Sequence, residues 1–203
     1  MILAFAGLKG GQGKTTLAVR VAAWLARAGH RTVLVDAAPT GSASALLGFG
    51  GAVPGPGAGE LLARRHDIVV VDLPPSQAGI ALATLATGAW IIVPVVPDEL
   101  GVAGLRSTLS WLKGLRPLRQ RSSRLAGIVL NQVESGLAGC ATCETALRAA
   151  HARDVFKAGV RRDNALRVGS TLSRVFRDRA PRGGDLDVRT LRSELLKLLV
   201  KRG

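Results

Sequence analysis

Residues 1–16 decide the fold, and they read MILAFAGLKGGQGKTT. The stretch opens with a short apolar run, Ile2–Ala6, which predicts a buried β-strand. A glycine-rich turn over residues 7–13 follows and leads into Thr15–Ala28, where apolar side chains recur at helical spacing. A strand, a glycine-rich turn and a helix in this order are typical of a loop that holds the phosphates of a nucleotide.

The chemistry of this turn favours phosphate binding. Glycines let backbone N–H groups turn toward an anion, and the start of the following helix adds positive potential. Lys14 places a charge beside the β and γ phosphates, and the Thr15 hydroxyl is a ligand for Mg²⁺. The general phosphate-loop pattern would require a glycine where Leu8 stands. We therefore expect ATP or ADP with Mg²⁺, bound by Gly10, Gly11, Gln12, Gly13, Lys14, Thr15 and Thr16.

Apolar runs alternate with helical patterns along the rest of the chain. The alternation predicts repeated βαβ units, and hence an α/β fold with a mostly parallel, twisted sheet and helices on both faces. We expect one P-loop NTPase domain over residues 1–203, with its ligand at the carboxyl ends of the strands. Further strands are predicted at Thr32–Asp36, Ile68–Asp72, Trp90–Val96 and Ala126–Asn131, with Val155–Phe156 as a short edge strand. Helices are predicted at Thr40–Leu47, Gly59–Arg65, Gln77–Thr87, Glu99–Leu115, Glu144–Ala152 and Val188–Val200, and loops at Gly48–Gly59 and Gly136–Cys143.

The positive charge of the chain is concentrated in its second half. The formal net charge is +14; residues 1–105 hold 7 Lys/Arg and 6 Asp/Glu, whereas residues 106–203 hold 21 and 8. Such a surplus favours a polyanion-binding face, with nucleic acid ahead of an anionic membrane or a simple solubility surface. No segment has the form of a signal peptide or approaches the ~20 apolar residues of a membrane span, so we expect a cytoplasmic protein.

Residues 9–16, KGGQGKTT, resemble the deviant Walker motif of the ParA/MinD family of ATPases at every position. That family does not require the glycine that is missing at Leu8. In the family, the first lysine of the motif reaches across a sandwich dimer to the nucleotide of the partner. The resemblance therefore implies that Lys9 acts in trans while Lys14 acts in cis, and that the chain forms a homodimer when it binds ATP.

Two strand ends resemble acidic segments of the same family. The stretch HDIVVVDLPPS resembles its Walker B segment, which implies that Asp72 holds Mg²⁺ through water. The stretch VLVDAAPTGSAS resembles a switch segment whose common form is DxDPQGxA. Asp36 matches the first acid, as a catalytic group, but Ala38 and Thr40 replace the second acid and the glutamine. An alanine cannot orient or deprotonate a water, so we expect slow hydrolysis aided by another residue, hydrolysis that depends on a partner, or a nucleotide switch with little turnover.

Later segments extend the resemblance over nearly the whole chain. The stretch GIVLNQV places Asn131 where the family uses an asparagine on the adenine base. Compact partition ATPases of the family bind DNA non-specifically as ATP-bound dimers and respond to a ParB-like partner. The resemblance thus implies a nucleoid-associated ATPase that positions a plasmid, a chromosome or another cargo. The candidate DNA contacts in the basic half are Lys157, Arg161, Arg162, Arg174, Arg177, Arg179 and Arg182.

Two features leave alternatives open. Cys140 and Cys143 form a single CxxC pair, and iron–sulfur carrier ATPases related to the family place such a pair after the same strand. A metal site needs about four ligands, so an inert or redox-active thiol pair is also considered. The leucine-rich segment 191–200 predicts an amphipathic helix that docks on the core, as we expect, or lies on a membrane as in MinD-like relatives. A MinD-like membrane positioning factor and an iron–sulfur carrier are therefore the alternative functions, with a membrane not the expected partner.

Overall fold

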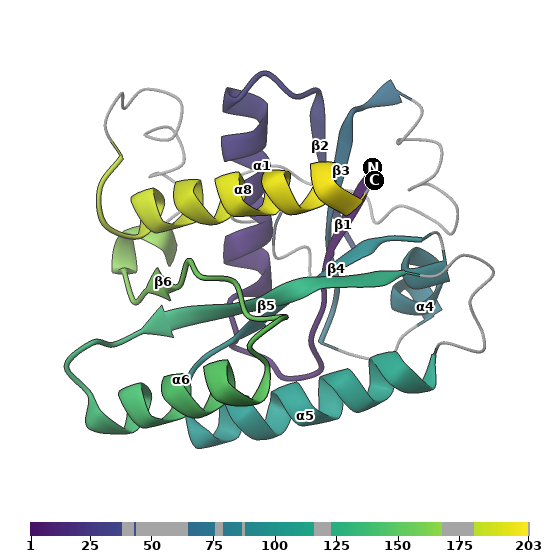
Figure 1. Cartoon of the computed structure of the whole chain (residues 1–203). Helices are drawn as coiled ribbons and strands as arrows, with labels where there is room; N and C mark the ends of the chain where they lie inside the picture. Colours follow the sequence, from purple (N-terminus) through teal and green to yellow (C-terminus); the bar gives the residue numbers. More distant parts are fainter. Residues whose placement is uncertain are drawn as a thin grey trace.

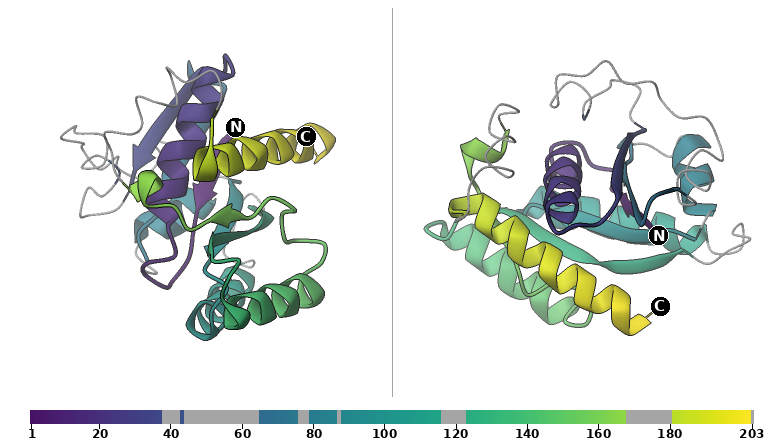
Figure 2. Two further views of the ribbon diagram at one scale, coloured as in Figure 1. Left: turned by 90° about the vertical axis from the view of Figure 1, so that its left-hand side faces the viewer. Right: turned by 90° about the horizontal axis from the view of Figure 1, so that it is seen from above.

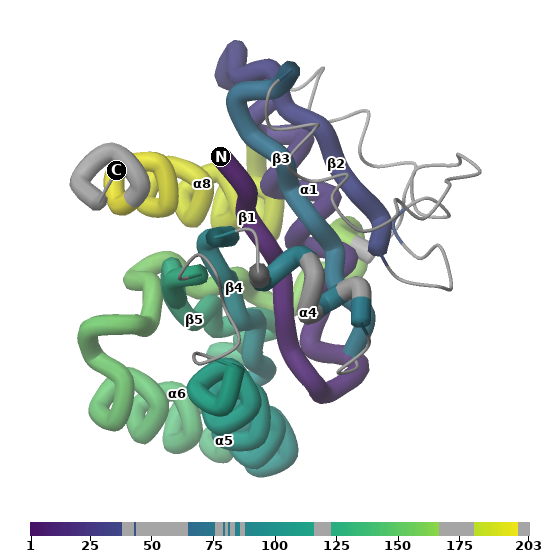
Figure 3. The backbone as a smooth tube through the Cα atoms, turned by 90° about the vertical axis from the view of Figure 1, so that its right-hand side faces the viewer, coloured from purple at the N-terminus to yellow at the C-terminus, as the bar shows by residue number. Residues whose placement is uncertain are grey.

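A six-stranded sheet forms the centre of the molecule (Figure 1). The computed structural model describes residues 1–37, 43, 65–75, 79–86, 88–115, 123–167 and 181–202. All strand pairs in the sheet are parallel, and the order is β2-β3-β1-β4-β5-β6, so that β1 lies between β3 and β4 (Figure 3). The strands are β1 Ile2–Phe5, β2 Thr32–Asp36, β3 Ile68–Asp72, β4 Trp90–Val95, β5 Arg124–Val133 and β6 Val160–Arg161.

Helices cover both faces of this sheet (Figure 2). Helices α1 and α8 pack against one face, whereas α4, α5 and α6 pack against the other. The helices are α1 Lys14–Arg27, α4 Gly79–Ala86, α5 Glu99–Gly114, α6 Ala138–Ala150 and α8 Gly183–Arg202, with the 3₁₀ helix η2 at Asn164–Arg167. None of the helices in the described ranges combines the length and the apolar character needed to cross a bilayer.

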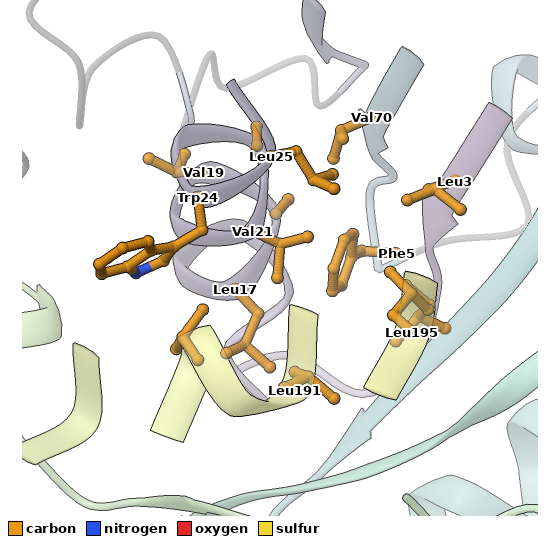
Figure 4. Close-up of a cluster of buried hydrophobic side chains, with 14 of the residues drawn as sticks. Leu3, Phe5, Leu17, Val19, Val21, Trp24, Leu25, Val70, Leu191 and Leu195 are labelled. Carbon is orange, nitrogen blue, oxygen red and sulfur yellow. The ribbon is translucent and has the colours of Figure 1, made fainter. Parts of the chain in front are cut away.

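An aliphatic core fixes α1 and α8 on the sheet (Figure 4). Phe5 of β1, Leu17 and Val21 of α1 and Leu191 of α8 meet in this cluster, and all four are almost fully buried. Each buried side chain of this size stabilises the fold by roughly 1.5–3 kcal/mol. Because β1 and α1 are packed on each other here, the two ends of the loop between them are held at fixed positions.

The prediction of a loop over Gly136–Cys143 is wrong from Ala138 onward, because α6 begins there. Gly136 and Gly139 suggested a loop, but a single glycine lowers helix stability by only about 1 kcal/mol. The N–H of Ala141 donates to the carbonyl oxygen of Leu137 at 3.1 Å, which carries the helical pattern past Gly139.

The predicted edge strand at Val155–Phe156 is also corrected. The edge strand is β6, and Val155 makes only an isolated bridge to Ile128. Phe156 packs in the core, where its ring lies close to Gly127. This burial, and not a place in a strand, explains the apolar residue at this position. The predicted segments Thr40–Leu47, Gly48–Gly59 and Gly59–Arg65 lie outside the described residues, apart from Ala43 and Arg65.

A buried arginine ties α1 to the C-terminal elements. The Arg20 side chain has no solvent exposure, and its guanidinium donates to the Asp185 carboxylate at 3.0 Å and to the carbonyl oxygen of Ala165 at 2.9 Å. Asp163 accepts hydrogen bonds from the N–H groups of Ala165 at 2.8 Å and Gly184 at 2.9 Å. These contacts hold η2 and the start of α8 against the helix that follows the phosphate loop.

Candidate nucleotide-binding site

A pocket of about 470 Å³ opens where the predicted phosphate loop meets the carboxyl ends of the strands. The loop connects β1 to α1. In the sheet, β1 and β4 are neighbours, with β3 beside β1 and β5 beside β4, so the carboxyl ends of these four parallel strands lie together. Six of the seven predicted loop residues and Asn131 line this pocket, whereas Gln12 does not. The lining residues are Gly10, Gly11, Gly13, Lys14, Thr15, Thr16, Leu73, Pro75, Asn131, Gln132, Arg161, Arg162, Asp163 and Leu166.

The loop requires glycine at two positions. Gly11 and Gly13 have φ angles of 76° and 83°, in the left-handed region that other residues rarely adopt. A Cβ at Gly13 would also overlap the side-chain amide of Asn131. Gly13 is the N-cap of α1, and the first N–H groups of a helix have no partner within it, so they are donors for an anion.

Lys14 lies beneath the loop with 7% of the residue exposed. Its ammonium donates to the carbonyl oxygen of Lys9 at 3.2 Å. Burial lowers the pKa of Lys14, and the negative charge of Asp72 opposes that shift. An ammonium from which water is largely excluded interacts strongly with an incoming anion, because the effective dielectric constant is low.

Two carboxylates end neighbouring strands beside Lys14. Asp36 of β2 and Asp72 of β3 are register partners, so their backbones are about 5 Å apart, the spacing of neighbouring strands. Asp72 is 1% exposed, and among the described residues neither of its oxygens has a partner in good hydrogen-bond geometry. Burial raises the pKa of Asp72 to about 6; the Thr15 hydroxyl and Lys14 lower this pKa, and Asp36 raises it. Unsatisfied carboxylate oxygens near a hydroxyl form a donor set that Mg²⁺ accepts.

The Lys9 side chain lies against the start of α5. Its ammonium is 3.9 Å from the Asp98 carboxylate at the start of α5, and its stem passes so close to Gly104 that a Cβ there would contact it at 2.9 Å. Lys9 lines a second pocket, of about 670 Å³, together with Gln12 and the starts of α5 and α6. The two lysines therefore line different pockets, Lys14 the first and Lys9 the second.

Both cysteines line the second pocket. Cys140 is buried and its Sγ accepts a hydrogen bond from the N–H of Glu134 at 3.4 Å, whereas Cys143 is half-buried; both are free thiols. Within the described part of the chain, no three His, Cys, Asp or Glu side chains are grouped to hold a metal ion. A metal centre at the CxxC pair would therefore need ligands from beyond the described residues of one chain.

Asn131 reaches the pocket wall, but it also holds the phosphate loop. It is 4% exposed, and its Nδ2 donates to the carbonyl oxygen of Gln12 at 2.9 Å. The side chain of Gln12 accepts a hydrogen bond from the N–H of Val96 at 2.8 Å. Gln132, next to Asn131, donates from Nε2 to the carbonyl oxygen of Gly11 at 2.9 Å. These anchors could not be predicted from the sequence, because the partners are 84 to 121 positions apart.

The predicted DNA contacts fall into two groups. Arg161 is paired with Asp187 through two contacts of 2.7 and 2.9 Å, and Arg162 is paired with Glu134 at 2.5 Å. Both arginines line the first pocket beside the loop. The remaining candidates are Lys157 and Arg182, which are exposed, and Arg174, Arg177 and Arg179, which lie outside the described residues.

Comparison with known proteins identifies the family. The model of the CobQ/CobB/MinD/ParA nucleotide binding domain matches residues 3–171. The chain belongs to this family. The membership confirms the prediction made from residues 9–16, that of a ParA/MinD-type P-loop ATPase domain.

Individual relatives of this family member support the same conclusion. It is 30% identical to the chromosome-partitioning ATPase Soj of Thermus thermophilus over 88% of each chain. It is 34% identical to the maintenance of carboxysome distribution protein A of Halothiobacillus neapolitanus, over 65% of this chain and 66% of that relative. Its fold matches the septum site-determining protein MinD of Pyrococcus horikoshii, solved with Mg-ADP, with a TM-score of 0.75 and 17% identity over 100% of this chain and 98% of that chain. The predicted fold class is thereby confirmed.

Proposed function

We propose that this family member, taken as one domain over residues 1–203, is an ATPase that dimerises around Mg-ATP and positions DNA or another large cargo. The observation that carries the proposal is the buried Lys14 at the start of α1, beside the aligned carboxylates Asp36 and Asp72. A cation at a helix start suits phosphate, and the carboxylates suit the metal that accompanies it. The names of the relatives, for chromosome partitioning and carboxysome distribution, support the cargo class.

In this proposal, different residues of the pocket bind the phosphates, the metal ion and the base. Backbone N–H groups of residues 10–16 surround the phosphates, and Lys14 neutralises their charge. The Thr15 hydroxyl would hold Mg²⁺ together with Asp72, which would act through water, a role that fits the buried and unsatisfied oxygens of Asp72. Mg²⁺ in this place neutralises phosphate charge. Asn131 keeps one amide hydrogen and its carbonyl oxygen for the adenine base.

Calorimetry tests the binding step. Folded protein is titrated with Mg-ATP and Mg-ADP, and we expect saturable binding of both nucleotides at one site per chain. A protein that is folded by circular dichroism and yet gives no binding heat at several temperatures would contradict the proposal.

Turnover is expected to be slow in the protein alone. Asp36 is the only acid in the switch segment, because Ala38 stands where the family pattern that this segment resembles has a second acid. We therefore propose that hydrolysis depends on DNA and on a ParB-like protein that supplies a basic residue. Phosphate release is measured with the protein alone, with DNA, and with the partner added. A rate that neither addition changes would favour a nucleotide switch.

Lys9→Ala is expected to abolish ATP-dependent dimerisation while changing the affinity of the monomer for Mg-ATP, measured at protein concentrations too low for dimers, by less than about threefold. Lys9 lines the second pocket and Lys14 the first, so the loss of the Lys9 side chain should leave the first pocket intact and remove, besides its contact with Asp98, the contact made in trans. The mass of the protein is measured by light scattering with and without ATP. The matched control is Lys113→Ala, an exposed lysine on α5. Dimers of Lys9→Ala at wild-type concentration would exclude this role.

The DNA-binding part of the proposal depends on the basic second half of the chain. Among the described candidates, Lys157 and Arg182 are exposed. Arg161 is less suited to DNA, because its guanidinium is already paired with Asp187. We therefore assign non-specific DNA contacts to Lys157, Arg182, Arg174, Arg177 and Arg179, and a nucleoid location follows from them.

The double variant Lys157→Glu/Arg182→Glu is expected to weaken ATP-dependent DNA binding about tenfold at low salt. Each phosphate contact contributes a slope of about −0.9 to the dependence of log K on log salt, so the slope should also become shallower. Fluorescence anisotropy of labelled duplex DNA measures both quantities, and Lys113→Glu, at an exposed lysine on α5 outside the candidate set, is the comparison. Binding to anionic vesicles in place of DNA would instead identify a MinD-like membrane factor.

A further inference from the structure

The backbone of Gln132, at the end of β5, departs from a regular strand. Its φ angle is 54°, and it is the only non-glycine residue with positive φ in the described part of the chain. The pairing of β5 with β6 shifts register between Asn131 and Val133, so the irregularity is a bulge at Gln132. Bulges near functional sites often redirect a side chain, and the left-handed conformation costs a non-glycine residue about 1–2 kcal/mol.

The bulge brings two neighbouring side chains to the same loop. In a regular strand, Asn131 and Gln132 would point to opposite faces. Here both side-chain amides donate at 2.9 Å to the phosphate loop, Asn131 to the carbonyl oxygen of Gln12 and Gln132 to that of Gly11. The two acceptors are consecutive in the chain. The bulge therefore has a specific result: the side-chain amides of Asn131 and Gln132 donate hydrogen bonds to the carbonyl oxygens of two successive loop residues.

Holding these two carbonyl groups also orients the N–H groups of the loop. A trans peptide keeps its C=O and N–H antiparallel, so fixing the carbonyl of Gly11 fixes the N–H of Gln12, and fixing that of Gln12 fixes the N–H of Gly13. The loop is anchored on its other flank by the Gln12 side chain, which accepts from the N–H of Val96. Gln132 itself lines both pockets, so it lies at the boundary between them.

The geometry points to Gln132 as a positioning residue for nucleotide binding, which aims the N–H groups of the phosphate loop at the expense of a left-handed backbone. This inference rests on the proposed nucleotide site and assigns it a further residue. Gln132 does not have to touch the nucleotide to act, because it works through the carbonyl oxygen of Gly11. Loss of its amide would leave the loop in place but less ordered before the ligand arrives.

Gln132→Gly separates this role from a structural one. Glycine adopts φ of 54° without strain, so we expect an unchanged or slightly higher midpoint of thermal unfolding. Without the amide, the Kd for Mg-ATP should rise about three- to tenfold, which corresponds to the loss of one hydrogen bond. Gln132→Asn also tolerates the backbone but is one methylene too short to reach Gly11, and it should behave like glycine. Thr145→Ala, exposed on α6, is the control that should change neither quantity.

A measurement without nucleotide supports the same test. Hydrogen exchange at the N–H groups of Gln12 and Gly13 should be several-fold faster in Gln132→Gly than in the wild type or in Thr145→Ala. Wild-type affinity in both Gln132 variants, or a loss of affinity that parallels a loss of stability, would overturn the inference alone. A wild-type protein that does not bind Mg-ATP would overturn the proposed function, and this inference with it.

Discussion

Lys14→Ala is expected to weaken the binding of Mg-ATP by about 100-fold while the protein stays folded. Removing one member of a buried, hydrogen-bonded charge pair costs about 2–5 kcal/mol, and each 1.4 kcal/mol is tenfold in affinity. Lys14 is buried at the start of α1, where little water competes with the phosphate for its ammonium. Alanine leaves the loop N–H groups in place, so weak residual binding is the expected limit. Calorimetry with Mg-ATP, supported by the shift in unfolding temperature on adding nucleotide, measures the effect.

Two companions make the Lys14 experiment specific. Lys14→Arg keeps the charge but replaces a compact ammonium by a planar guanidinium, and it should also bind poorly because the buried space under the loop suits a point charge. Lys113→Ala removes an exposed lysine on α5 and should bind as the wild type does. The free energy of unfolding without nucleotide should change by less than about 1 kcal/mol in Lys14→Ala, since burial already disfavours its ammonium. Undiminished Mg-ATP binding by a folded Lys14→Ala protein would remove the basis of the proposed site.

The contiguous parts of the site could be predicted from sequence. The glycines, Lys14 and Thr15 lie within one eight-residue motif, and the strand ends at Asp36 and Asp72 follow from the apolar runs before them. Parallel pairing then aligns Asp36 with Asp72, because both strands end at the same edge of the sheet. Local chemistry and the periodicity of the chain are sufficient for these features.

The contacts that orient the loop could not be predicted in this way. Gln132 reaches Gly11 only because of a bulge and a left-handed residue, and neither has a sequence signal at a glutamine. Arg20 reads as an ordinary polar position on α1, yet it is fully buried against Asp185, which is 165 positions away. Such contacts depend on how separate elements pack, which no local pattern specifies.

The placement of Arg161 illustrates a related limit of sequence reasoning. A basic residue in a basic half suggested DNA, but the structure pairs its guanidinium with Asp187 at the start of α8 and places it on the nucleotide pocket. Neighbouring Asp163 also lines the pocket and accepts the N–H of Gly184 in the same helix. The wall of the nucleotide pocket and the first turn of α8 are therefore one connected unit, which net charge alone does not reveal.

Asp72→Asn is expected to stabilise the nucleotide-free protein at pH 8 while it removes most of the Mg²⁺-dependent binding of ATP. The folded-state pKa of Asp72, about 6, lies above the ordinary value of 3.8, so its ionisation opposes folding. The contribution of this carboxyl to stability is fully present below about pH 4, where it is protonated in both the folded and the unfolded protein. That contribution is lost as the pH rises through about 6, the folded-state pKa. Two pKa units correspond to about 3 kcal/mol at pH 8. Asparagine is also polar and buried, so we expect a net gain of about 1–2 kcal/mol.

The pH dependence distinguishes this cause from a general effect of the substitution. Urea unfolding at pH 8 should show the full gain for Asp72→Asn, and at pH 5 the gain should be much smaller, because the wild-type carboxyl is then largely protonated. In the same variant, Mg²⁺ should no longer strengthen ATP binding by more than about twofold, because the neutral amide of asparagine is a much weaker ligand for the ion and its bound waters. A gain of equal size at both pH values, or Mg²⁺ dependence that survives the substitution, would mean that Asp72 is not the buried carboxylate reserved for the metal. The opposite changes in stability and in metal-dependent affinity are what a group kept unsatisfied for its ligand should produce.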